Sequence, residues 1–393
     1  MPADQPEAAP VVTGSGASGL FTHPGLLLAG SAAFGMSTLF SAMKPILLTR
    51  LLEETSWSAA LAGLVVAMPF IGIALSSLLY YFRPPKNTVR ELALRFGVLL
   101  VAAELVSAVC VGAALPLLAA QFVAGFSVGA LMAATSRLVA VSEAADASFG
   151  FIDMMAVALM SVMVASIGMA VAAGGARGGY LLAAGIGALY ALVMFCYREA
   201  AVLRRHHQGA MGLPALRGRP IAVIAMGMVF VTCSGLGFAF MFSLAADLGM
   251  GYEAAGSRIG VLLLLSALAC QAGGWASGRF GPRLPLLAAF VCCAFGWWLA
   301  VNASTTGAFF LGLIPAVFAL QFNFPILLAL AGSLDEHGRW AGIAAPLITS
   351  GFAWAAVVAG AVVGVWGISA LPLATMTGMA VCTFLLWPAT AKS

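Results

Sequence analysis

The sequence predicts an all-α membrane protein with 12 transmembrane helices in two pseudo-symmetric six-helix bundles. The 393-residue chain is 62% hydrophobic and only 8% charged, whereas soluble domains carry about 25% charged residues. Its apolar residues form runs close to the ~20 residues that span a bilayer. A basic interval at 198–219 divides these runs into two equal sets.

Each apolar run is long enough for one helix. The predicted spans are 25–49, 58–82, 92–114, 116–138, 150–173, 178–197, 220–246, 256–278, 284–302, 307–331, 340–364 and 368–388. Helices are expected because only helices and closed barrels satisfy every backbone group in lipid, and the runs do not alternate as barrel strands do. The predicted domains are therefore bundles at 25–197 and 220–388.

The remaining segments are expected in water. Residues 1–24 are small, polar and rich in Pro and Gly, and they lack the basic start of a signal peptide, so a disordered cytoplasmic segment is expected. Residues 198–219 form a basic cytoplasmic linker, in which His206 and His207 are expected to be solvated, and 389–393 form a cytoplasmic tail.

Orientation follows from the basic residues, which are enriched in cytoplasmic loops. With the amino terminus inside, the cytoplasmic segments hold Arg83, Lys86, Arg90, Arg137, Arg198, Arg204, Arg205, Arg217, Arg219, Arg279, Arg283, Arg339 and Lys392. The outer segments hold only Arg50, Arg177 and Arg258, and Lys44 and Arg95 fall within spans. Both termini are thus predicted to be cytoplasmic, in a bacterial inner membrane.

The two halves of the sequence show weak similarity to each other. The turn at 143–151 has a counterpart at 335–343, and this offset aligns Gly150 with Gly342. Together with the six-plus-six spacing, this match favours parallel structural repeats.

Two motifs resemble those of the major facilitator superfamily. Residues 274–283 read G-x-x-x-G-R-x-G-x-R, similar to that family's G-x-x-x-D-R-x-G-x-R/K inner-loop motif, with Gly278 in place of the acid. The helix around Gln121, Gly125 and Gly129 resembles the family's R-x-x-x-G-x-x-x-G pattern, with Gln121 in place of arginine. The resemblance covers about residues 25–388. It implies a central cavity lined by the first, fourth, seventh and tenth helices.

Lys44 is the main candidate for substrate binding. Ser37, Ser41 and Lys44 share one face of the first predicted helix. A lysine within a span indicates a functional site, here one that attracts an anion from the cavity. The alternative is that its long side chain reaches the outer interface. Lysine followed by Pro45 is also similar to monocarboxylate transporters at those positions.

Glu104 lies near the middle of the third predicted span, where an isolated carboxylate is costly. It is either a proton-coupling carboxyl or a protonated group that is hydrogen-bonded to a neighbouring helix. The family resemblance makes the third helix peripheral, which favours the second role.

Other polar and apolar residues complete the predicted substrate site. Gln121 is expected to contact either substrate or another helix, whereas Gly125 and Gly129 allow close helix packing. Gln321 and Asn323 lie about 200° apart on one helix, so both cannot face the cavity squarely. The remaining candidates are Phe238 and Met241.

The cytoplasmic loops supply the gate candidates, which are Asp153, Arg279, Arg283, Asp335, Glu336 and Arg339. Arg279 and Arg283 could pair with Asp335 and Glu336 in one state and separate in another; alternatively, they only fix topology. Asp153 is expected either to compensate charge at a helix amino terminus, the favoured role, or to pair in the gate.

Several other classes find no support in the sequence. The 7 cysteines and 18 methionines show no metal-ligand spacing, and no nucleotide-binding or catalytic motif occurs. We therefore expect no metal, no cofactor, no nucleic acid partner and no enzyme. A receptor or assembly factor would need a partner-binding domain that is not found in this chain.

The function these observations favour is secondary transport, by alternating access, of a small organic solute, more specifically an anion such as a carboxylate. Proton-coupled symport by a monomer is the expected mode. The alternative is efflux of lipophilic drugs or metabolites through a pocket rich in Met and Phe. Against that alternative, the fifth predicted helix lacks the signature of drug–proton antiporters.

Overall fold

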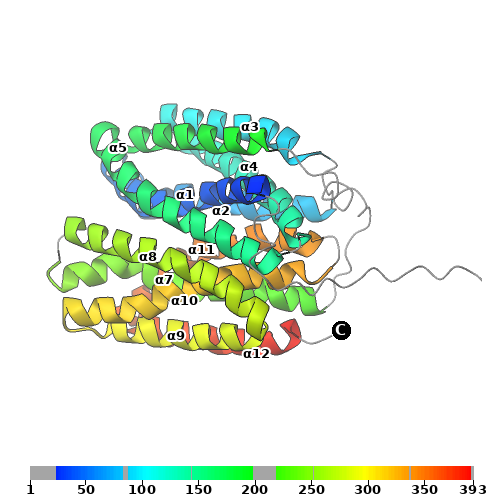
Figure 1. Cartoon of the computed structure of the whole chain (residues 1–393). Coiled ribbons are helices and arrows are strands. Elements are labelled where there is room, and N and C mark those ends of the chain that lie inside the picture. The colour runs from blue at the N-terminus through cyan, green and yellow to red at the C-terminus, as the bar shows by residue number, and fades with distance from the viewer. Residues whose placement is uncertain are drawn as a thin grey trace, which may run out of the picture.

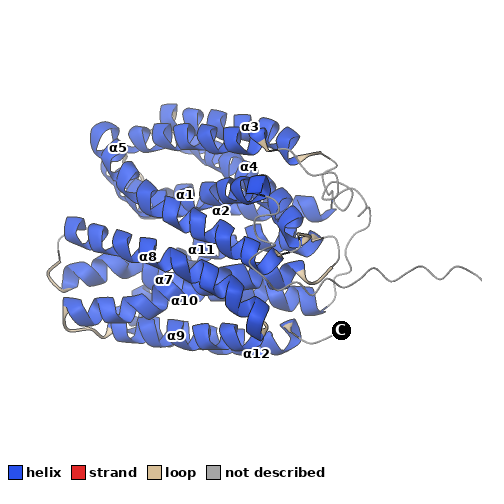
Figure 2. Cartoon of the chain, viewed as in Figure 1, coloured by secondary structure: helices blue, strands red, loops and turns tan. Residues whose placement is uncertain are grey.

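The computed structural model describes residues 24–82, 87–142, 144–197, 218–250, 252–335 and 338–390. These segments form long helices that run side by side, and the described residues contain no strand (Figure 2). Helices α1–α5 lie together in the upper part of Figure 1, and α7–α12 lie together in the lower part.

The predicted fold class is confirmed, since 12 helical segments are long and apolar enough to cross a membrane. The helices are α1 Pro24–Glu54, α2 Ala59–Phe82, α3 Val89–Val109, α4 Ala114–Ala140, α5 Ala145–Cys196, α7 Gly218–Asp247, α8 Tyr252–Phe280, α9 Arg283–Val301, α10 Thr306–Gly332, α11 Arg339–Trp366 and α12 Leu371–Ala389, with a short 3₁₀ turn at Ile368–Ala370. Most of the predicted linker and the two terminal segments lie outside the described residues.

Helix α5 contains two of the spans, separated at Gly174 and Gly175, where the backbone is not helical. Gly175 has φ of +61°, which favours glycine. The Glu54 carboxylate, at the end of α1, accepts hydrogen bonds of 3.0 and 3.2 Å from the Ala176 N–H. An acid at a helix amino terminus satisfies a free N–H group and complements the helix dipole. Glu54 therefore fixes the turn between the two spans.

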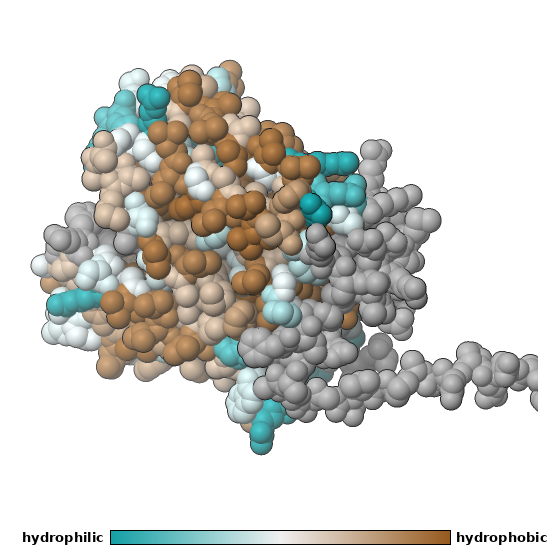
Figure 3. Space-filling model, turned by 45° about the horizontal axis from the view of Figure 1, so that its top comes forward, coloured by the Kyte–Doolittle hydropathy of each residue, from teal (hydrophilic) through white to brown (hydrophobic). Residues whose placement is uncertain are grey.

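The outer surface of the helices is apolar. Large hydrophobic side chains are widely exposed, including Leu115 at 79%, Phe384 at 78% and Val109 at 77%. Figure 3 shows apolar residues over the middle of one face and polar residues near its margins. Because such a surface would be unstable in water, it is the surface that lipid covers.

Helices α2 and α4 approach each other through glycine. A side chain at Gly125 would meet the backbone of Pro69, and one at Gly129 would meet Ser76 and the Ile73 backbone. Gly72 on α2 approaches the α4 backbone in the same way. The packing role expected of Gly125 and Gly129 is confirmed, and it brings Gln121 on α4 close to α2.

The two groups of helices also meet through small residues. Gly150 on α5 lies against the backbone of α8 at Cys270 and Gly274, and Gly342 on α11 lies against the backbone of α4 at Ala133. Gly338 approaches Arg137 and Ala140 at the end of α4. These contacts lie at one end of the bundle, which we call the Arg339 end. The two glycines aligned by the sequence repeat are thus both contact points between the groups.

Replacing Gly125 with alanine should lower the melting temperature of the purified protein by several degrees. The new Cβ meets helix backbone that cannot move aside cheaply, and overpacking of this kind costs about 1–3 kcal/mol. Gly63→Ala is the matched control, because nothing lies within 4 Å of a Cβ there. Equal melting temperatures for the two variants would contradict the packing account.

Candidate functional site

Lys44 on α1 reaches the opposite group of helices. Its Nζ donates a 3.3 Å hydrogen bond to the Phe352 carbonyl on α11 and lies 5.7 Å from the centre of the Phe70 ring. No carboxylate among the described residues forms an ion pair with it. The Lys44 side chain extends from α1 toward α11 and not along α1 toward its end. Its positive charge therefore lies between the two groups of helices without an ion-pair partner in the described part of the chain.

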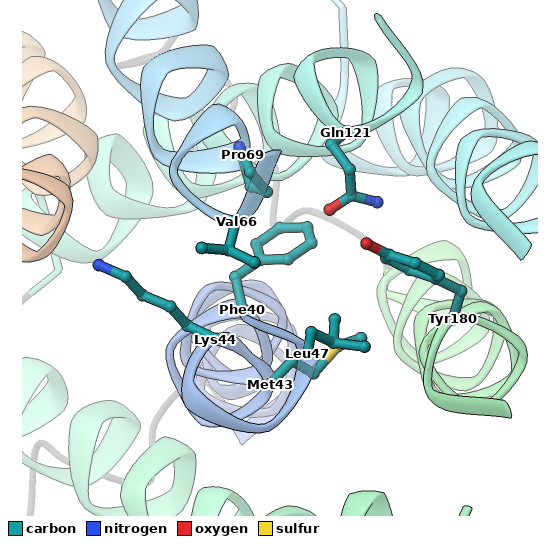
Figure 4. A pocket seen from close by; sticks show the side chains of 8 residues that line it. All are labelled: Phe40, Met43, Lys44, Leu47, Val66, Pro69, Gln121 and Tyr180. Carbon is teal, nitrogen blue, oxygen red and sulfur yellow. The ribbon is translucent and has the colours of Figure 1, made fainter. Parts of the chain in front are cut away.

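Lys44 also lines a small pocket within the first group of helices. Its walls come from α1, α2, α4 and the second span of α5, and they comprise Phe40, Met43, Lys44, Leu47, Val66, Pro69, Gln121 and Tyr180. In Figure 4, Gln121 and Tyr180 point toward each other, whereas the Lys44 amine extends away from them. The pocket therefore has one cationic margin and one neutral polar margin.

Glu104 belongs to a buried polar network behind that neutral margin. The Gln121 amide nitrogen donates to Glu104 Oε2 at 3.3 Å and to Ser107 Oγ at 2.9 Å. The other Glu104 oxygen and the Tyr180 hydroxyl have no hydrogen-bond partner among the described residues. Gln121 thus makes the interhelical hydrogen bonds that were one of its two expected roles, and it connects Glu104 to the pocket wall.

The two serines on α1 do not line this pocket. The Ser37 hydroxyl donates to the Phe34 carbonyl of its own helix at 2.9 Å. Ser41 is partly exposed. Of the three residues that share this face of α1, Lys44 is therefore the one that lines the pocket and contacts α11.

On α10, Gln321 and Asn323 are both buried. Neither polar atom of the Asn323 side chain has a hydrogen-bond partner among the described residues. The next residue, Phe324, meets the Phe34 ring of α1 edge-on, with ring centres 6.3 Å apart. Asn323 is therefore a fully buried polar side chain without a hydrogen-bond partner among the described residues, and it does not line the Lys44 pocket.

Of the two candidates on α7, Phe238 packs within its own group of helices. The Phe238 ring packs edge-on against Trp297 of α9, with centres 5.5 Å apart. Met241 is buried. The structure thus brings neither residue to the Lys44 pocket.

Asp153 does not have the role favoured from the sequence. Helix α5 begins at Ala145, earlier than predicted, so Asp146 occupies its first turn and Asp153 lies more than two turns inside. The Asp153 side chain is buried beside Cys270 of α8, and its Oδ2 has no hydrogen-bond partner among the described residues. It therefore joins α5 to α8, which fits the gate interpretation and not charge compensation at the helix terminus.

Asp335 organises the Arg339 end. Its carboxylate accepts hydrogen bonds from the Arg339 side chain at 2.8 Å and from the Trp340 N–H at 3.2 Å, so it caps α11. Arg137, at the end of α4, is buried and lies within electrostatic range of both Asp335 and Arg339. From the sequence, Arg137 is counted only among the basic residues that set the orientation in the membrane. Its position inside a predicted span was nevertheless a signal that it contacts other helices.

The expected pairing of Asp335 with Arg279 or Arg283 is not made in this structure. Arg283 instead donates to Thr390 after α12, at 2.5 Å to the hydroxyl and 3.2 Å to the carbonyl. Arg279 lies over the rings of Trp275 and Phe280. Both arginines are held by neighbouring aromatic side chains and by α12, away from the start of α11. Glu336 lies outside the described residues.

Three further residues join the site that sequence reasoning did not single out: Ser107, Tyr180 and Cys270. Nothing in their local sequence distinguishes them from other residues of apolar spans. Within the part of the chain that the structure describes, no cluster of three His, Cys, Asp or Glu side chains could hold a metal ion.

No family model and no curated protein sequence matches the chain. Solved structures do match it closely in shape. The E. coli fucose:proton symporter FucP superposes with a TM-score of 0.68 at 16% identity, covering 94% of this chain and 99% of that one. The major facilitator superfamily proton:xylose symporter XylE gives 0.72 at 12% identity, covering 94% and 95%.

A third match is the human organic anion transporter MFSD10, with a TM-score of 0.69 at 15% identity over 92% of this chain and 98% of that one. At these identities the likeness establishes a shared fold over almost the whole of each chain.

Proposed function

The chain has the major facilitator superfamily fold, and from that premise we propose that the protein is a secondary active transporter of a small organic solute. The superposed structures are transporters of fucose, xylose and organic anions. In the proposed cycle, domains at 25–197 and 220–388, joined by the linker at 198–219, rock about a site between them. The sequence holds no nucleotide-binding motif, so the proposed energy source is an ion or solute gradient.

We place the protein as a monomer in a bacterial inner membrane with both termini in the cytoplasm. The distribution of Lys and Arg supports this orientation. The Arg339 end would then face the cytoplasm. Since α4 and α5 meet α11 and α8 there through Gly342 and Gly150, the structure would represent a state that is closed on the cytoplasmic side.

An anionic substrate is supported by Lys44. Its amine lies between the two groups of helices with only a carbonyl and an aromatic face as partners. A partly desolvated cation without a counter-ion is unfavourable, so an anion that enters there gains a strong partner. This observation carries the proposed substrate class, for which a carboxylate is the simplest candidate.

Proton coupling is supported by the position of Glu104. It is the buried carboxyl that Gln121 links to the pocket wall. One of its oxygens is without a partner among the described residues, as is the Tyr180 hydroxyl. We propose that Glu104 exchanges the coupling proton while Gln121, Asn323 and Gln321 supply neutral polar contacts to the substrate. Of these three, Gln121 lines the Lys44 pocket in this structure.

The proposed gate consists of Arg137, Asp335 and Arg339 at the contact between α4 and α11. The contact of Asp153 with Cys270 joins α5 to α8 at the same end. Opening on this side would separate both pairs of helices.

Replacing Lys44 with alanine should reduce anion uptake at least about tenfold, because hydrogen bonds to charged groups contribute about 1.5–3 kcal/mol. The substrate is first sought by thermal-shift screening of organic anions and neutral analogues, and its uptake is then measured in proteoliposomes. Arg95→Ala is the control, since Arg95 is an exposed cation in another span. Anion uptake by Lys44→Ala at the wild-type rate would contradict the anion proposal, and export of lipophilic compounds would then be favoured.

Replacing Glu104 with glutamine should abolish gradient-driven accumulation but leave downhill exchange. Glutamine still accepts the hydrogen bond from Gln121, but, unlike a carboxyl group, it cannot take up or release a proton. Uptake is measured with and without an imposed proton gradient. Glu91→Gln, which alters the exposed carboxylate that caps α3, should keep the wild-type response. Proton-driven accumulation by Glu104→Gln equal to wild type would rule out the role of Glu104.

A further inference from the structure

Arginines lie at the ends of α7, α8 and α9, and two of them contact the carboxyl end of α12. Arg219 of α7 donates to the Ala389 carbonyl at 3.1 Å, and Arg283 of α9 donates twice to Thr390. Arg279 ends α8 and is separated from Arg283 by a tight turn in which Gly281 has φ of +71°. No ion pair joins any of the three to an acid among the described residues. The carbonyls of α12 offset part of this charge, since a helix end carries about half an elementary charge.

Exposed aromatic rings lie beside two of these arginines, Arg279 and Arg283. The guanidinium of Arg279 lies 5.7 Å from the centre of the Trp275 ring, and that of Arg283 lies 5.5 Å from the centre of the Trp387 ring. Trp275 is 57% exposed and Trp387 is 64% exposed. Phe280, Leu284 and Phe384, which lie near these residues in the sequence, are also exposed.

The cluster lies where the membrane-spanning segments end. The spans of α7, α8, α9 and α12 begin or end at Gly218, Phe280, Arg283 and Ala389. Tryptophan is enriched at this level of the bilayer, where its ring meets both hydrocarbon and headgroups. Basic side chains at the same level attract anionic lipid headgroups. The loop holds no acid that would neutralise them, because Gly278 stands where the similar family motif has an aspartate.

We propose that Arg279 and Arg283, with Trp275 and Trp387, form a binding site for the phosphate of an anionic phospholipid. Arg279 makes no hydrogen bond to the described residues, and Arg283 uses only its Nε and one terminal nitrogen on Thr390, so donors remain in each guanidinium for phosphate oxygens. The exposed rings, together with Leu284 and Phe384, would contact the acyl chains. This apolar surround favours a lipid over a soluble phosphate compound.

The test is native mass spectrometry of the full chain, with phosphatidylglycerol or phosphatidylcholine added to detergent-purified protein. Wild type should retain phosphatidylglycerol in preference to phosphatidylcholine. The double variant Arg279→Gln/Arg283→Gln should lose roughly tenfold or more of that preference, since each basic residue at the surface contributes about fivefold. The charge-matched control is Arg90→Gln/Arg258→Gln, whose arginines are also exposed but lie elsewhere; it should behave as wild type.

Arg279 contacts Trp275 and Phe280 of its own helix and not α12, so Arg279→Gln alone tests the site even if the double variant fails to fold. It should lose about fivefold of the preference. A double variant that folds and binds phosphatidylglycerol like the control would overturn the site. So would binding of soluble glycerophosphoglycerol as tight as that of the lipid. None of these measurements depends on transport.

Discussion

Hydrocarbon offers a peptide N–H group no hydrogen-bonding partner, and the described part of this molecule is built to satisfy its backbone polar groups internally. The described segments bond their backbones internally as helices, and their outward side chains are apolar. Since lipid gives helices little hydrophobic reason to associate, they must pack through backbone approach and polar contacts. Glycines at 125, 129, 150 and 342 provide that approach. The break at Gly174 and Gly175 is tolerated because the Glu54 carboxylate satisfies the exposed Ala176 N–H.

Because a polar group is costly inside the membrane, the partner of each buried polar side chain indicates which helices it links. Lys44 contacts a carbonyl of the opposite group of helices, Asp153 contacts Cys270, and Glu104 contacts Gln121. The first two contacts join helices that the proposed cycle must separate, whereas the third lies within one group. This division suits a transporter in which the Glu104–Gln121 network stays intact while the contacts between the two groups of helices form and break. Arg279 and Arg283 lie instead at the ends of spans, beside exposed tryptophans, where we propose that an anionic lipid binds.

The sequence predicts local features well. Span lengths depend on bilayer thickness, so the helices could be found from apolar runs alone, and the packing role of Gly125 and Gly129 followed from spacing. The start of α5 was misplaced because the polar stretch before residue 150 resembled a loop, and that error changed the role of Asp153. The partners of Arg279, Arg283 and Lys44 depend on how distant helices dock, which no local pattern encodes. Tyr180 was missed for the same reason, whereas the position of Arg137 inside a predicted span was a signal for its closer role.

The central claim is that the two groups of helices move as separate bodies about the contacts at the Arg339 end. Pulsed electron paramagnetic resonance on the chain in nanodiscs tests it most directly, with spin labels at Ser142 after α4 and Ser333 after α10. The native cysteines must first be replaced, because Cys196 and Cys292 are exposed. The account predicts two distances whose populations shift with pH or bound substrate, while a control pair at Asn87 and Ser142 keeps a single distance. One invariant distance between Ser142 and Ser333 under all conditions would contradict it.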